Sequence, residues 1–303
     1  MKNLVYAFAV IVLGSCPVLS QDSRDEIIRS EGDRFPIHVT YYPAAEDSNP
    51  SGTMNAPVVV FLHGDNGARI QWDKGSAPRG ATPFPAELQK RGFAAITVDL
   101  RKHGESIVEG SEQPVRPNDY RKMVVGDLAA VKKFIFEEHQ KQRLNMNKMA
   151  IVAIGFSAPV AAGFAEVDWK QVPYDDAALA ADRTPRGQDV QALILVSPET
   201  SAGTVIASRS LTFLRRTGMK LLVIAGAQDR AAKKSAESLH QIFVATKGAE
   251  GNAEIVLPDL KDNGLPLLVK APGATLVPML KFLDENVKEK QSVWKDRRSR
   301  LER

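Results

Sequence analysis

Ser157 is the side chain in this sequence best placed to do chemistry. It lies in the segment Ile154-Gly155-Phe156-Ser157-Ala158-Pro159, between an apolar run and a stretch of small residues. A serine on a tight turn between a strand and a helix can attack an acyl carbon, because the turn exposes its hydroxyl. Such a serine needs a general base, and the base needs an acid that orients it.

The elements that must position this serine alternate along the chain. Short apolar runs alternate with longer amphipathic segments, which predicts βαβ units and a mostly parallel sheet. We therefore expect an α/β fold of three layers, with helices on both faces of a central sheet. The expected strands are 35–42, 57–62, 93–100, 149–155, 190–197, 220–226 and 253–257, and the expected helices are 84–91, 120–139, 158–166, 205–216, 231–246 and 274–288.

Three segments give the sequence a family resemblance. They are Phe61–Gly67 (FLHGDNG), Gly92–Ser106 with its Asp-x-Arg-x-His-Gly-x-Ser ending, and Ile154–Pro159. Together they resemble the α/β-hydrolase superfamily of lipases, esterases and serine peptidases, and the resemblance extends from Phe35 to Asn286.

The resemblance implies a role for each site residue. Ser157 would be the nucleophile and Asp229, after the 220–226 strand, the acid. The backbone N–H groups of Asp65 and Ala158 would form the oxyanion hole, where fixed donors stabilise developing charge. Asp99 and Arg101 (with the rest of their loop) would brace the structure. One departure is Pro159, which stands where the family usually has a second glycine.

The histidine is the missing member of this constellation. The family order is serine, acid, histidine, so the base should follow the last strand, but residues 259–274 contain no histidine. His63 and His103 lie at carboxyl ends of predicted strands and are remote substitutes, although the family's histidines there are structural.

Two functions remain open on this evidence. The first is a serine hydrolase that acts on an ester, amide or related acyl bond. The second is a non-catalytic pseudo-hydrolase that binds a small-molecule or peptide ligand, or a partner, in the cleft above the sheet. No cofactor is expected, and no metal, since the sequence has no cysteine cluster or closely spaced histidine pair.

The first twenty residues have the pattern of a secretory leader. Lys2 precedes the apolar stretch Leu4–Leu13, and small residues lead to Ser20. An alternative is a lipoprotein signal that ends before Cys16, the only cysteine. We expect export to the periplasm or the extracellular space, as a soluble protein or a lipid-anchored lipoprotein, with membrane contact only if Cys16 is lipidated.

The remaining chain is expected to form one domain, residues 21–288, with a polar excursion at 168–189 and a basic tail at 289–303. The net charge is +4, and Lys288–Arg303 alone holds seven Lys or Arg against three Asp or Glu. The folded body therefore has no basic excess, which argues against a nucleic-acid partner. The tail is expected to be solvated, and a weaker third interpretation gives it an anionic polymer or lipid to bind.

Overall fold

A central sheet of eight strands organises the computed structural model, which describes residues 23–50, 52–110, 114–245 and 250–303. The predicted leader and Cys16 lie outside the described residues. The buried central strands are apolar throughout, as expected for parallel strands covered on both faces. The strands of this sheet are β1 (Arg24–Arg29), β2 (Pro36–Tyr42), β3 (Val58–Leu62), β4 (Ala94–Val98), β5 (Met149–Ile154), β6 (Val190–Val196), β9 (Lys220–Ile224) and β10 (Ala253–Val256).

The sheet is mostly parallel, with the order β1-β2-β4-β3-β5-β6-β9-β10. Only β1 and β2 run antiparallel to their neighbours. The parallel strands therefore end at one edge, and the loops that follow them meet there. A separate short hairpin pairs β7 (Ser201–Ala202) with β8 (Val205–Ile206).

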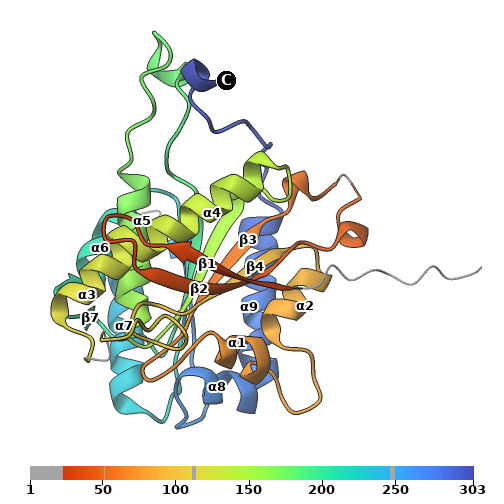
Figure 1. Ribbon diagram of the computed structural model, residues 1–303. Helices are drawn as coiled ribbons and strands as arrows, with labels where there is room; N and C mark the ends of the chain where they lie inside the picture. The colour runs from red at the N-terminus through yellow and green to blue at the C-terminus, as the bar shows by residue number, and fades with distance from the viewer. Residues whose placement is uncertain (1–22, 51, 111–113, 246–249) are drawn as a thin grey trace, which may run out of the picture.

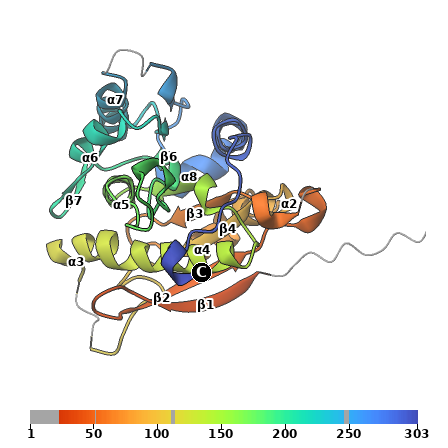
Figure 2. The ribbon, with the colours of Figure 1, turned by 90° about the horizontal axis from the view of Figure 1, so that it is seen from above.

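Helices cover both faces of the sheet, as Figures 1 and 2 show, so the expected three-layer α/β architecture is confirmed. Side chains from α4 to α7 pack on one face, and side chains from α1, α2, α8 and α9 pack on the other. The helices are α1 (Ile70–Gly75), α2 (Phe84–Lys90), α3 (Pro117–Lys122), α4 (Leu128–Gln140), α5 (Ser157–Trp169), α6 (Ala207–Leu214), α7 (Arg230–Val244), α8 (Gly264–Lys270) and α9 (Leu276–Leu283). The π-helical turns are η3 (Met123–Asp127) and η8 (Asp284–Lys288), and the 3-10 turns are η1 (Glu46–Ser48), η2 (Thr53–Asn55), η4 (Met146–Lys148), η5 (Ala180–Asp182), η6 (Glu250–Asn252), η7 (Pro272–Ala274) and η9 (Arg300–Glu302).

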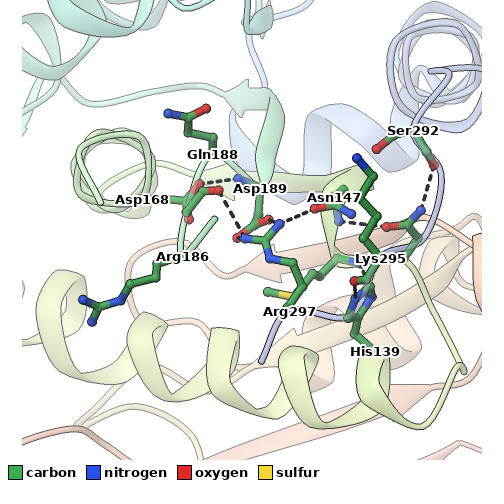
Figure 3. A network of polar contacts seen from close by, with 12 residues as sticks. His139, Asn147, Asp168, Arg186, Gln188, Asp189, Ser292, Lys295 and Arg297 are labelled. Atoms are coloured by element: carbon green, nitrogen blue, oxygen red, sulfur yellow. Dashed lines mark hydrogen bonds and ion pairs between the residues drawn. The ribbon is translucent and has the colours of Figure 1, made fainter. Parts of the chain in front are cut away.

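The basic tail differs from the solvated segment that the sequence predicts. It crosses the body and ends against the 168–189 excursion, at the end of the molecule opposite α1 and α8 (Figure 1). Arg297 is only 4% exposed and pairs with the buried carboxylate of Asp189 at 2.7 Å. The indole of Trp294 stacks on His139 and donates to its carbonyl at 2.9 Å. The tail is bound because its charges meet partners that are distant in sequence (Figure 3).

Membrane-spanning character is weak in the described part of the chain. No single helix there is long and apolar enough to cross a bilayer, and only the bent pair Gly264–Lys270 with Pro272–Lys288 qualifies, by length and composition.

Candidate active-site cleft

A cavity of about 460 Å³ opens at the carboxyl edge of the parallel strands. Its wall comes from the loops after β3, β5, β6 and β9 and from the start of α8. This is the edge at which α/β proteins place ligands. The residues that line the cavity include Asp65, Gly155, Glu199, Asp229 and Asn263.

Gly155 occupies the strained position of the turn after β5. Its φ is +57°, a conformation that favours glycine, and its N–H donates to the carbonyl of Val196 at 3.1 Å. A Cβ atom added at Gly155 would lie 3.4 Å from Asp65 Oδ2 and 3.9 Å from Glu199 Oε1. A side chain at position 155 would therefore enter the cavity.

Ser157 lies two residues later, at the start of α5, and it does not face the cavity. The residue is fully buried, and its Oγ donates to the carbonyl of Ile154 at 2.9 Å and accepts from the Ile154 N–H at 3.0 Å. Its hydroxyl thus fastens the turn to the end of β5. The sequence predicted that this oxygen projects above the sheet. In the structure it is buried within the turn instead.

The predicted oxyanion donors also fall differently. The N–H of Ala158 donates to the carbonyl of Gly155 at 3.1 Å, so the helix turn already uses it. Asp65, by contrast, lies in the wall of the cavity, and the role of its backbone N–H as an oxyanion donor stays a prediction. Pro159 fits within the first turn of α5, where a missing N–H is tolerated.

Asp229 reaches the cavity, and its partner there is Asn263. The side chain of Asp229 caps α7, with Oδ1 accepting from the N–H groups of Ala231 and Ala232 at 2.9 Å each. Its Oδ2 accepts from Asn263 Nδ2 at 2.6 Å. The Ala232 N–H and then the Asn263 amide hold the pKa of Asp229 below its ordinary value. Asn263 lies in the segment where the family order requires a histidine, and an amide cannot take up a proton as a general base.

Comparison with solved structures identifies the fold. No protein-family model and no curated protein matches the sequence. An esterase from Pyrococcus furiosus is similar over 88% of this chain and 92% of its own, with a TM-score of 0.59 at 12% identity. Dienelactone hydrolase from Anabaena variabilis is similar over 87% of this chain and 96% of its own, with a TM-score of 0.56 at 15% identity. This chain has the α/β-hydrolase fold.

A third solved α/β-hydrolase-fold neighbour is an acetyl xylan esterase from a Paenibacillus species. It covers 90% of this chain and 86% of its own, with a TM-score of 0.54 at 16% identity. The neighbours named here are hydrolases by name, whereas the identities are low, so the likeness concerns the fold.

The two histidines near the cleft of this α/β-hydrolase fold have structural partners. His63 is fully buried, with Nδ1 2.8 Å from the carbonyl of Gly64 and Nε2 accepting from the Leu100 N–H at 3.2 Å. Burial lowers the pKa of His63 to about 4. His103 stacks on Phe156 and bonds the carbonyl of Arg101 through Nδ1 at 2.9 Å. The geometry brings neither imidazole into a bond with Ser157, whose Oγ is occupied by Ile154.

The Asp-x-Arg loop braces the fold, as the sequence predicted. Asp99 is fully buried and accepts from the backbone N–H of Arg69 at 2.6 Å and from that of Glu105 at 3.0 Å. Arg101 is 2% exposed and forms a buried ion pair with Asp127. These two residues therefore hold the loop after β4 in place, away from the cavity wall.

The sequence did not predict that the carboxyl groups of Asp65 and Glu199 lie near each other. Both approach the position that a side chain at Gly155 would occupy, and the two carboxyl groups are in contact. Partial burial of its carboxyl, followed by the neighbouring Asp65, raises the pKa of Glu199 to about 7. A carboxyl group beside another acidic side chain is harder to ionise, which is the direction seen for Glu199. The available signal was the position of Glu199, just after a strand that ends at the same edge.

Metal ligation has no support in the described residues. No group of three or more His, Cys, Asp or Glu side chains there is arranged to hold a metal ion. The carboxylate of Asp229 is instead bonded to two backbone N–H groups and to Asn263.

Proposed function

We propose that this protein is an exported, non-catalytic member of the α/β-hydrolase fold that binds a ligand in the cleft. The proposal rests on the residue types at the three positions where a serine hydrolase has its catalytic triad. Glycine stands at the strained turn, aspartate at the acid position, and asparagine in hydrogen-bond contact with that aspartate. Acyl transfer needs a nucleophile and a base, and here neither position supplies one.

The cleft itself supports ligand binding. Its volume of about 460 Å³ is in the range of small-molecule sites, about 300–1,000 Å³. Asp65, Glu199 and Asp229 contribute carboxyl groups to its wall, and none of the lining residues is Lys or Arg. These acceptors favour a small molecule or peptide end that carries amine or hydroxyl donors.

A serine hydrolase is the second candidate. The solved neighbours named above are esterases and a dienelactone hydrolase, and Asp229 is retained at the acid position. This candidate needs Ser157 to leave its two bonds to Ile154 and to find a base.

A fluorophosphonate probe separates the two candidates. The purified protein and its Ser157→Ala variant are incubated with the probe and assayed for p-nitrophenyl ester turnover. The proposal predicts no labelling and no turnover for either protein. Labelling that disappears in Ser157→Ala would instead establish the hydrolase.

Export is proposed from the leader pattern of residues 1–20. Secretion from the native host would yield a chain that begins at Gln21, or a lipidated chain that begins at Cys16. The intact mass of the mature protein distinguishes these forms from an uncleaved anchor that keeps Met1, and a chain that stays in the cytoplasm would contradict the proposal.

A further inference from the structure

A second cavity lies far from the cleft, at the opposite end of the sheet. It also has a volume of about 460 Å³, and its walls are α4, α5, the turn before α4, and the 168–189 excursion. Arg297 of the C-terminal tail completes the wall. Figure 1 shows the excursion and the tail together at this end, with α1 and α8 at the other.

The inner surface of this cavity is apolar. Phe164 and Val124 are buried within it, and Phe136, Val167 and Ala129 are partly buried. Phe136 and Val167 also pack against the main core cluster. An acyl chain in this cavity would contact aromatic and branched side chains, which removes apolar surface from water.

Three ion pairs among four side chains form the polar side of the cavity. Lys132 bonds Asp168 and lies 2.7 Å from Asp189, and Arg297 also pairs with Asp189. Figure 3 shows this network of Asp168, Asp189 and Arg297. Two cations meet two carboxylates, so the network itself carries no net charge. The Nε–H of Arg297 is buried, however, and has no hydrogen-bond partner among the described residues.

The rim carries two exposed cations, Lys133 and Arg186. Arg186 is exposed, lies over the ring of Tyr174 at 5.1 Å, and forms no ion pair within the described part of the chain. Figure 3 shows its side chain directed away from the Asp168 and Asp189 network. Lys133 is exposed and lies 3.9 Å from Glu31. The lining residues thus include four cations, of which two face solvent, and one carboxylate, Asp168.

We propose that this second cavity binds a single-chain amphipathic anion, such as a fatty acid, with its chain against Phe136 and Phe164 and its head group at Lys133 and Arg186. The apolar wall selects the chain, and the rim cations select a negative head group over a positive one. This site is independent of the cleft and of its proposed function.

Titration with a dansyl-labelled undecanoate tests the proposal on the full protein. The emission of the probe should shift to the blue and saturate as the binding curve of a single site. Laurate should displace the probe and dodecylammonium should not. Absence of saturable binding, or equal displacement by dodecylammonium, would overturn the proposal.

Variants locate the site. Ala129→Trp fills the cavity and should abolish binding, and Lys133→Glu with Arg186→Glu should weaken it at least about tenfold.

The matched control is Arg79→Glu with Lys281→Glu, which reverses two exposed charges elsewhere and should leave the Kd unchanged. Circular dichroism confirms that each variant is folded. Unchanged binding in Ala129→Trp, or equal weakening in the control, would contradict the assignment, as would loss of binding in the cleft variant Asp65→Asn.

Competition also identifies the source of the anion. Laurate presents a carboxylate, and lauroyl lysophosphatidic acid presents a lipid phosphate on the same chain length. Displacement by either supports the proposal, and the stronger competitor identifies the preferred head group. Failure of both to displace the probe would count against an anion-selective site.

Discussion

Asn263 donates a 2.6 Å hydrogen bond to Asp229, and the pair lines the same cavity as Gly155. Under the proposed function, this acid, the side chain bonded to it and the glycine turn occupy the positions of a catalytic triad without its reactive groups. Two substitutions should then supply those groups.

Gly155→Ser combined with Asn263→His should therefore create esterase activity. The new serine side chain would enter the cavity, since a Cβ there meets its nearest atom at 3.4 Å, and the new imidazole would take the place of the amide on Asp229. Hydrolysis of p-nitrophenyl acetate should rise at least about tenfold over either single variant, because a nucleophile and its base act as a unit. Activity of the double variant no greater than that of the wild type would show that position 155 is not the nucleophile position.

Ser157→Ala should destabilise the protein without altering any reaction. The change removes both bonds between Ser157 and Ile154 at a buried turn, which should cost about 1–3 kcal/mol of the free energy of unfolding. Urea unfolding measures the loss, and Ser201→Ala, at an exposed serine, is the control. A variant as stable as the wild type would mean that the hydroxyl does not fasten the turn.

The fold was accessible from sequence because its signals are local. A parallel sheet is predicted by the apolar runs of β3, β5 and β6, each only a few residues long. The loop from Asp99 to Ser106 is recognised from an equally short motif. The strand β1 was not predicted, because its residues are mostly charged and it gains its place by pairing with β2.

The site was harder to predict, because its assignment depends on where β5 ends. The pattern Gly-x-Ser suggests Ser157 as the nucleophile, but the strand ends at Ile154, so the strained turn falls on Gly155. Strand ends cannot be fixed to one or two residues from apolar runs alone. The contacts Asp229–Asn263 and Arg297–Asp189 join residues far apart in the chain, and no periodicity reports such pairs.

Stability should depend on pH through Glu199. Its pKa rises from an ordinary value of 4.5 to about 7 in the folded protein, so between these values the folded state binds more protons than the unfolded state. The free energy of unfolding should therefore fall as the pH rises through this window and level off above it. Urea unfolding at about pH 5, inside this window, and at about pH 8, above it, should show this fall in the wild type and a smaller one in Glu199→Gln. An equal fall in both proteins would assign the pH dependence to other groups.

Removal of the Arg297 side chain should show that the tail is part of the folded domain. Arg297→Ala leaves Asp189 with Lys132 as its remaining cation, and should lower the free energy of unfolding by about 2–4 kcal/mol. Arg298→Ala, at an exposed neighbour that pairs with Asp296, should change stability little. Equal effects of the two substitutions would mean that the buried pair contributes nothing beyond a surface one.

The proposed function requires that position 155, and not Ser157, faces the cleft. The reactivity of a thiol placed at each position measures this directly. Gly155→Cys and Ser157→Cys are each made in a Cys16→Ser background, which leaves one cysteine in the chain. The native proteins are then alkylated with iodoacetamide, and the rates are followed by intact mass. The account predicts that Gly155→Cys reacts readily and that Ser157→Cys, buried in the turn, reacts at least about a hundredfold more slowly. Rapid alkylation of Ser157→Cys with protection of Gly155→Cys would contradict it.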